Sequence, residues 1–170
     1  SMSHEIRTPL NAIVGLSECI KKSNNIDEIH EDANDVVTAS QNLLEIVNGI
    51  LDISKIEAEK MEIVETTYNP IEVLNELKTL IQARLGEKEI DFRCNFAPDI
   101  PNTLYGDKGK IKQIITNILT NAVKYTEKGY INFDVKCIND SDDCKLQIIV
   151  SDTGRGIKEE QMDKLFTKFE

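Results

Sequence analysis

The 170-residue sequence has no apolar run approaching the roughly 18 residues that a helix needs to span a membrane. It also lacks the Gly-x-x-x-x-Gly-Lys-[Ser/Thr] pattern of P-loop nucleotide-binding proteins. Basic residues are scarce, with 20 Lys and Arg against 30 Asp and Glu, and the net charge of −10 argues against a nucleic-acid partner. We therefore expect no membrane contact within this segment and a cytoplasmic location, with any membrane anchor of a larger protein lying upstream.

The cysteines are few and do not form a metal-binding pattern. The sequence has four of them, with no Cys-x-x-Cys pair and no metal-ligand spacing to a histidine: Cys19, Cys94, Cys137 and Cys144. We interpret them as free thiols in a reducing compartment. Cys137 and Cys144 flank an expected β-hairpin, so the alternative for this pair is a disulfide across that hairpin.

The first third of the chain has a helical period. One helix is predicted from Ser3 to Lys22, and a second begins after a cap at Asn25 or Asp27. The second helix carries an apolar stripe in alternating steps of four and three residues: Ile29, Ala33, Val36, Ser40, Leu43, Val47, Ile50 and Ser54. A single helical hairpin cannot cover its stripes, so we predict a homodimer whose hairpins form a four-helix bundle. The alternative is that the stripe packs on the second domain.

After residue 61 the spacing of the apolar residues no longer follows the helical period of the first part. This change predicts a first domain over 1–61 and a second over 62–170. The second domain is expected to mix strands and helices. The predicted elements are a strand at 62–67, a helix at 70–85, a strand at 90–96, a helix at 107–125 and a hairpin of strands at 130–139 and 144–151.

His4 lies on one face of the first predicted helix, together with Thr8 and Asn11, while apolar residues including Ile6 and Leu10 occupy another face. A lone histidine near a terminus is usually a solvated surface residue. A neutral imidazole, whose ordinary pKa is about 6.5, is nevertheless a good nucleophile, and the adjacent carboxylate of Glu5 can fix its tautomer.

The segment Ser3-His4-Glu5-Ile6-Arg7-Thr8-Pro9-Leu10 resembles the H-box of sensor histidine kinases, which carries the phosphorylated histidine. The resemblance implies that His4 accepts a phosphoryl group from ATP and that Glu5 orients or deprotonates the imidazole. It also implies that Thr8 positions water for dephosphorylating a partner, and that this partner is the receiver domain of a response regulator.

The predicted helix over 107–125 carries two sets of residues. Its apolar set is expected to be buried: Ile111, Ile114, Ile115, Ile118, Leu119 and Ala122. Asn117, Asn121 and Lys124 lie along a separate edge. Polar residues on an outer helix face are ordinarily just solvated, but amide oxygens suit Mg²⁺ and a lysine suits phosphate.

The segment Asn117-Ile118-Leu119-Thr120-Asn121-Ala122-Val123-Lys124-Tyr125-Thr126 resembles the N-box of the same kinases. That resemblance implies an ATP site with Mg²⁺ as cofactor. In it Asn121 ligates Mg²⁺, Asn117 and Lys124 approach the phosphates, and Tyr125 packs near the nucleotide.

The segment Asp152-Thr153-Gly154-Arg155-Gly156 follows directly after an apolar predicted strand. Glycines there let the backbone approach a ligand closely, and a carboxylate can accept a hydrogen bond from an exocyclic amine. Taken alone, this motif is usually just a turn. It resembles the first glycine box of the family, which implies that Asp152 recognises adenine and that Gly154 and Gly156 line the site. Met162 to Phe169 resembles the F-box.

Together these resemblances imply an α+β chain: a helical hairpin that dimerises as a four-helix bundle, then an α/β sandwich of the Bergerat, or histidine-kinase ATPase, fold. The family continues with an ATP lid and a second glycine box, which do not occur before Glu170, so we expect the sandwich to be incomplete at its C-terminal end. The predicted function is ATP-dependent autophosphorylation of His4 and phosphoryl transfer to a response regulator, with phosphatase activity toward it. The alternatives are a catalytically impaired, dimeric phosphoacceptor and docking module, and an ATPase without histidine transfer.

Overall fold

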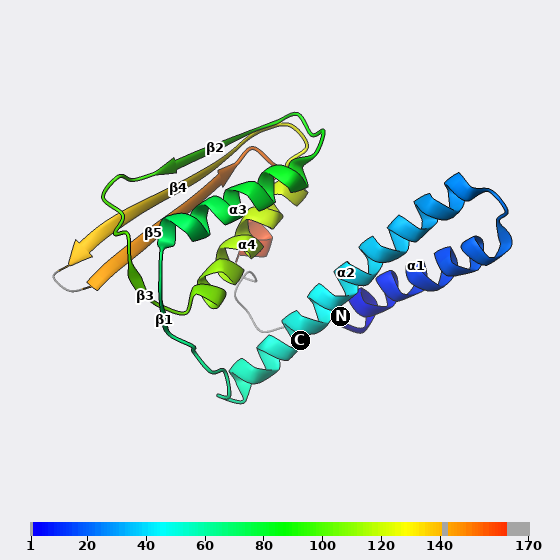
Figure 1. Ribbon diagram of the computed structural model, residues 1–170, viewed down its shortest axis with the longest axis horizontal. Helices are drawn as coiled ribbons and strands as arrows, with labels where there is room; N and C mark the ends of the chain where they lie inside the picture. The colour runs from blue at the N-terminus through cyan, green and yellow to red at the C-terminus, as the bar shows by residue number, and fades with distance from the viewer. Residues whose placement is uncertain (1, 141–142, 163–170) are drawn as a thin grey trace. The chain divides into compact units, whose positions relative to one another are not determined.

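The computed structural model describes residues 2–140 and 143–162, which divide into two compact units over residues 2–62 and 63–162 (Figure 1). Among the described helices, none combines the length and the apolar character needed to cross a bilayer.

The first unit is a helical hairpin made of α1 (Met2–Lys22) and α2 (Ile26–Glu57). Asn25 is the N-cap of α2, and its side chain accepts a hydrogen bond of 3.1 Å from the backbone N–H of Asp27. The predicted ends of α1 are confirmed to within one residue, and the predicted cap of α2 is confirmed at Asn25.

Two apolar stripes run along α2. The predicted stripe is mostly half-buried, although Val47 and Ser54 are exposed. A second stripe, which was not predicted from the sequence, consists of Val37, Leu44 and Leu51 at seven-residue intervals. Their exposed fractions are 54%, 60% and 52%, respectively. Since a seven-residue interval keeps side chains on one face of a helix, α2 presents a continuous apolar face to its surroundings.

The second unit contains a three-stranded sheet, a two-stranded ribbon and helices on one side. The elements described within residues 63–162 are β1 (Thr66–Tyr68), α3 (Pro70–Leu85), β2 (Ile90–Phe96), β3 (Leu104–Gly106), α4 (Lys108–Tyr125), β4 (Gly129–Asp140), β5 (Asp143–Asp152) and α5 (Glu159–Met162). The sheet order is β2-β4-β5, with β2 and β4 parallel and β4 and β5 antiparallel. Strands β1 and β3 pair antiparallel in the separate ribbon.

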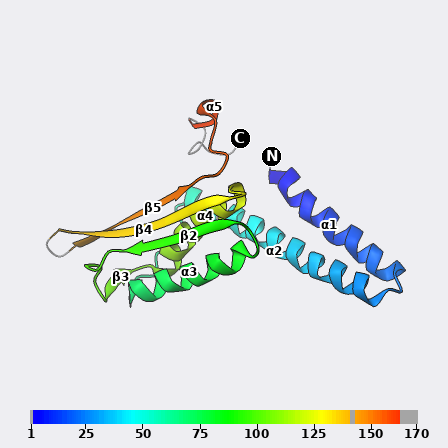
Figure 2. The same cartoon turned by 90° about the horizontal axis from the view of Figure 1, so that it is seen from above.

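Helices α3 and α4 cover one face of this sheet, as Figures 1 and 2 both show. Alternate residues of β4 point from the sheet toward these helices, and Ile131, Phe133 and Val135 among them are fully buried. The helices supply the other half of the core: Val73, Leu74, Leu77, Ile81 and Leu85 from α3, and Ile115, Leu119, Ala122 and Val123 from α4. The predicted two-layer α/β sandwich is therefore confirmed.

The prediction that Ile114 and Ile118 are buried is wrong. They are 60% and 46% exposed, whereas Ile115 and Leu119 are 1% and 0% exposed. One residue along a helix turns the side chain by about 100°, and α4 is covered only on the side of the sheet and α3. The true buried stripe is therefore narrower than the predicted one.

Two further expectations need correction in the strands. The strand predicted at 62–67 lies at Thr66–Tyr68, and β3 lies between the predicted strand at 90–96 and the predicted helix at 107–125, where no element was predicted. Thr66 pairs with Gly106 and Tyr68 pairs with Leu104. The pairing joins segments about forty residues apart, so no local pattern in either segment reveals it.

The reading of all cysteines as free thiols is wrong for one pair. Cys137 and Cys144 form a disulfide across the β4–β5 hairpin, with their Cα atoms 6.4 Å apart. The alternative stated for this pair is therefore the one the structure shows, while Cys19 and Cys94 are free. Burial raises the pKa of the Cys94 thiol above its ordinary value.

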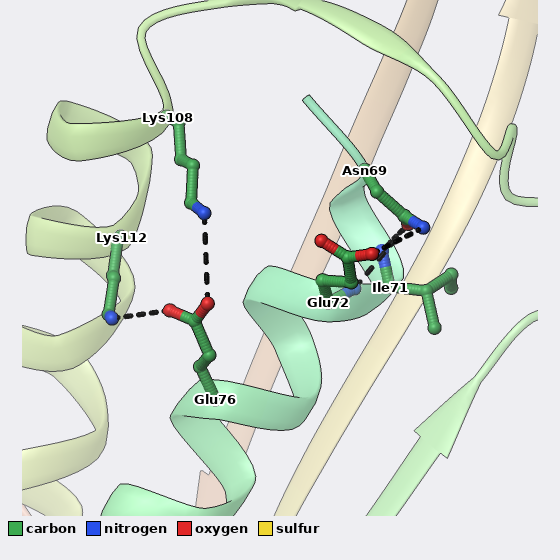
Figure 3. Close-up of polar contacts among 6 residues, drawn as sticks. All are labelled: Asn69, Ile71, Glu72, Glu76, Lys108 and Lys112. Atoms are coloured by element: carbon green, nitrogen blue, oxygen red, sulfur yellow. Dashed lines mark hydrogen bonds and ion pairs between the residues drawn. The ribbon is translucent and has the colours of Figure 1, made fainter. Parts of the chain in front are cut away.

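Helix α3 begins with a strong cap, seen in Figure 3, where the side chain of Asn69 accepts hydrogen bonds from the backbone N–H groups of Ile71 at 2.9 Å and Glu72 at 3.4 Å. Pro70 occupies the first helical position, so the cap and the proline together fix the residue at which α3 begins.

We expect Asn69→Ala to lower the free energy of unfolding by about 1 kcal/mol, because two backbone donors lose their acceptor. For a unit of this size that corresponds to a melting temperature lower by about 4–8 °C, measured by thermal denaturation. Asn75→Ala is the matched control, since Asn75 is exposed inside α3 and it is its backbone carbonyl, which the substitution keeps, that accepts the hydrogen bond from the hydroxyl of Thr79. Equal effects of the two substitutions would contradict the capping role.

Candidate functional site

The residues predicted to carry chemistry fall in both units. In the first unit His4 lies on α1 and its side chain is exposed, as is that of Glu5 beside it. The hydroxyl of Thr8, one turn further along, donates a hydrogen bond of 3.1 Å to the backbone carbonyl of His4. The helix thus presents an imidazole and a carboxylate to solvent on a regular backbone.

In the second unit, α4 carries Asn117, Asn121 and Lys124, and all three are exposed. They lie away from the buried stripe of Ile115 and Leu119, which packs into the core. Their amide and ammonium groups are therefore available to a ligand alongside α4.

The start of α4 is fixed by Asp107, whose carboxylate serves two segments. Its Oδ1 atom accepts a hydrogen bond from the backbone N–H of Lys110, and its Oδ2 atom accepts one from the backbone N–H of Val64, each at 2.9 Å. The hydrogen bond from Lys110, followed by that from Val64, holds the pKa of the Asp107 carboxyl below its ordinary value. Asp107 therefore links the first turn of α4 to the segment around Val64, at the start of the second unit.

Glu76 on α3 joins the first turns of α4, and Figure 3 shows its carboxylate between two lysines. Its oxygens lie 2.6 Å from the Nζ atom of Lys112 and 3.7 Å from that of Lys108. The hydrogen bond from Lys112 is the main reason why the pKa of Glu76 is lowered. These are exposed pairs, so they align α3 with α4 more than they stabilise the unit.

The opposite end of α4 is held by Lys88. Its Nζ atom donates hydrogen bonds to the backbone carbonyls of Val123 at 2.7 Å and Thr126 at 3.3 Å. A cation at the carbonyl end of a helix is also favoured by the helix dipole. Lys88 therefore fixes the turn that carries Lys124 and Tyr125, a role the sequence analysis did not predict.

The glycine-rich loop follows β5 and is internally ordered. The Oδ1 atom of Asp152 accepts a hydrogen bond of 2.8 Å from the backbone N–H of Gly154, whereas its Oδ2 atom has no partner among the described residues. Next to it, the hydroxyl of Thr153 accepts a hydrogen bond of 3.0 Å from the backbone N–H of Tyr130. The loop is thus tied to the start of β4, with one carboxylate oxygen of Asp152 left for a ligand.

The loop meets the end of α4 at Tyr125. The backbone N–H of Arg155 donates a hydrogen bond of 3.2 Å to the carbonyl of Tyr125. A Cβ atom at position 154 would lie 2.6 Å from that same carbonyl oxygen and 2.8 Å from Oδ1 of Asp152, so only glycine fits there. Gly156 has a positive φ of +67°, which also favours glycine.

The structure therefore brings Asp152 and Gly154 of the loop against Tyr125 of α4, beside Lys124. Asn117 and Asn121 lie further along the same helix. The predicted F-box lies outside the described residues, apart from Met162. Sequence reasoning missed Arg155, whose guanidinium lies 4.6 Å from the centroid of the Tyr125 ring, because nothing in either segment signals that they meet.

Comparison with known proteins finds two family matches in sequence order. Residues 1–59 match the His Kinase A (phospho-acceptor) domain, and residues 106–170 match the histidine kinase-, DNA gyrase B-, and HSP90-like ATPase. The first match contains the helical hairpin with His4, and the second contains α4 and the glycine-rich loop.

Similar full-length proteins include hybrid signal transduction histidine kinase F of Dictyostelium discoideum, 38% identical over 99% of this chain and 15% of that protein. Another is signal transduction histidine-protein kinase BarA of Escherichia coli K12, 34% identical over 99% of this chain and 18% of that protein. The chain thus spans less than a fifth of the length of these relatives.

Among solved structures, the full-length protein ShkA in complex with AMPPNP superimposes with a TM-score of 0.69. It is 25% identical, and the match covers 97% of this chain and 35% of that one. The match therefore extends over both units of the chain.

Proposed function

Because this chain belongs to the sensor histidine kinases, we propose that it transfers the γ-phosphoryl group of ATP to His4 and then to an aspartate of a response regulator. The observation that carries the proposal is the pairing of two features: an exposed histidine on α1, and a separate unit in which Asp152 and Gly154 meet the end of α4. Activity of the whole protein is part of this proposal, since the relatives are much longer.

The nucleotide site we propose lies between α4 and the glycine-rich loop. Asp152 has one carboxylate oxygen with no partner among the described residues, which suits the exocyclic amine of adenine. Gly154 provides the close backbone approach, since a side chain there would strike Tyr125 and Asp152. ShkA was solved with AMPPNP, an ATP analogue, which supports a nucleotide at this fold.

Asn117, Asn121 and Lys124 would face the phosphate end of the nucleotide. Mg²⁺, when bound, would supply charge neutralisation to the phosphates, and the amide oxygen of Asn121 is a ligand of the type it prefers. Lys124 would place a positive charge beside the phosphates, and Asn117 would contribute a polar side chain one helical turn before Asn121.

His4 is the proposed nucleophile. In the reaction its Nε2 atom attacks the γ-phosphorus, a nitrogen–phosphorus bond forms, and the bond from phosphorus to the leaving oxygen of ADP breaks. Glu5 would hold the imidazole in the tautomer that exposes the attacking nitrogen. Thr8 is proposed to position water for dephosphorylating the response regulator, with its hydroxyl released from the carbonyl of His4.

We also propose that the chain works as a homodimer, with the exposed stripe of Val37, Leu44 and Leu51 buried between two hairpins. Leu10 and Val14 on α1 are 45% and 52% exposed and would extend that contact. A receiver domain would dock on the resulting bundle beside His4, and a reaction that consumes ATP suits a cytoplasmic location.

The proposal is tested by incubating the whole protein with ATP labelled in the γ-phosphate, then adding a receiver domain. We expect acid-labile, alkali-stable labelling of the protein, which is typical of phosphohistidine, followed by loss of the label to the receiver. Labelling only when a second, active kinase is supplied would instead favour the phosphoacceptor and docking module. ATP hydrolysis without any labelling would favour a plain ATPase.

Gly154→Ala is expected to weaken ATP binding by at least about tenfold, because the added methyl group would push the loop away from α4. The affinity is measured by calorimetric titration. Gly49→Ala is the control, since Gly49 lies inside α2 and a methyl group added there meets nothing within 4 Å beyond its neighbours and the backbone of its own helix. Unchanged affinity of the Gly154 variant would contradict the close contact between loop and helix.

A further inference from the structure

We propose that Arg155, which lies between the two glycines of the loop, is a second phosphate-binding cation that acts with Lys124. The inference rests on the proposed nucleotide-binding function and adds a residue to that site. It assigns to Arg155 a direct contact with the phosphates of the nucleotide.

The geometry brings both cations to one aromatic ring. The guanidinium carbon of Arg155 lies 4.6 Å from the centroid of the Tyr125 ring, and the Nζ atom of Lys124 lies 5.3 Å from the same centroid. The backbone of Arg155 is held as well, by its hydrogen bond to the carbonyl of Tyr125. Two positive charges from different segments therefore converge where the loop meets α4.

The two cations lie together in a protein in which acidic residues predominate. Acidic residues outnumber basic ones by 30 to 20, and three other cations of the same unit have carboxylate partners. Lys108 and Lys112 approach Glu76, and Arg93 pairs with Asp91 at 2.6 Å. Within the described ranges, neither Lys124 nor Arg155 has such an ion pair. An anion supplied by a ligand would complete this cluster.

Arginine is well suited to this task, because its planar guanidinium donates several hydrogen bonds in a fixed fork that matches phosphate oxygens. Stacking on Tyr125 orients that fork before the ligand arrives, so less side-chain freedom is lost on binding. The simpler explanation is that Arg155 only packs on the ring. The two explanations differ in whether the effect of Arg155 depends on the phosphates.

The test compares ADP with adenosine, which has no phosphate, by measuring dissociation constants for the whole protein and its variants. We expect Arg155→Gln to weaken ADP binding by about tenfold and to change adenosine binding by less than about twofold. Arg155→Lys keeps the charge and is expected to retain more ADP affinity than Arg155→Gln. The matched control is Arg93→Gln, because Arg93 also stacks on a tyrosine, with its guanidinium 5.1 Å from the ring centroid of Tyr130.

Three results would overturn the inference while leaving the proposed function intact: unchanged ADP binding in Arg155→Gln, an equal loss for ADP and adenosine, or an equal loss in Arg93→Gln. Equal losses of ADP affinity in the lysine and glutamine variants would likewise assign the effect to shape and not to charge. Failure of the unaltered protein to bind ADP at all would overturn both this inference and the proposed function.

Discussion

Replacing His4 with glutamine is expected to abolish the incorporation of phosphate from ATP, while nucleotide affinity stays within about twofold of the unaltered protein. Glutamine approximates the size and polarity of the imidazole but has no nucleophilic nitrogen that could form the phosphoramidate. Affinity is unaffected because His4 belongs to the first unit, whereas the proposed nucleotide site lies wholly in the second. The measurement is labelling with γ-phosphate-labelled ATP in parallel with calorimetric titration.

The chain offers its own control for this experiment, because it contains two histidines. His30 is exposed on α2, and His30→Gln is expected to leave labelling unchanged. Persistent acid-labile labelling of the His4 variant would move the acceptor role to another residue. Loss of labelling in both variants would point to damage to the hairpin and not to loss of the nucleophile.

Leu44→Glu combined with Leu51→Glu is expected to convert the proposed homodimer into a monomer. Each leucine lies on the exposed stripe of α2, and burial of such a side chain contributes about 1.5–3 kcal/mol. A two-fold interface contains each substitution twice, so the dissociation constant of the dimer should rise by at least about a hundredfold. Sedimentation equilibrium over a range of concentrations measures this change.

Ile138→Glu is the matched control for the dimer, since Ile138 is 51% exposed on β4 and the substitution makes the same change from apolar to acidic. It is expected to leave the oligomeric state unchanged. A monomer in the unaltered protein, or a dimer that survives both leucine substitutions, would show that the stripe of Val37, Leu44 and Leu51 is not the contact surface.

Much of the fold followed from local chemistry in the sequence. Asn25, Asn69 and Asp107 each cap a helix in the structure, and small polar residues before an apolar period are strong signals of a helix start. The strand at 90–96 was predicted with its observed bounds, because its side chains alternate and glycine and proline lie beyond it.

The errors arose where structure depends on what an element packs against. The period of α4 could not show whether its apolar face is wide or narrow, so Ile114 and Ile118 were wrongly assigned to the core. The exposed stripe on α2 was missed for a related reason, because two overlapping periods fit the same helix. Strand β3 is three residues long, and its partner β1 lies far away in the sequence.

For the candidate site, sequence reasoning supplied residue types but not their mutual placement. Resemblance to known motifs pointed to Asp152 and Gly154 in one segment and to Tyr125 in another. The backbone contact between Tyr125 and Arg155, and the clamp of Lys88 on the end of α4, depend on the tertiary fold. Position 155 carries no special requirement in the motif, so its role becomes visible only beside the tyrosine ring.

Asp107 divides its two carboxylate oxygens between the first turn of α4 and the segment that leads into the second unit. A displacement of that segment at Val64 would therefore act on the first turn of α4 directly, without first passing through the sheet. Protonation would weaken both hydrogen bonds together, and since the pKa of Asp107 is lowered in the fold, this loosening sets in only as the pH falls through that lowered value. Protonation of the single Asp107 carboxylate would thus loosen the segment at Val64 and the first turn of α4 at the same time.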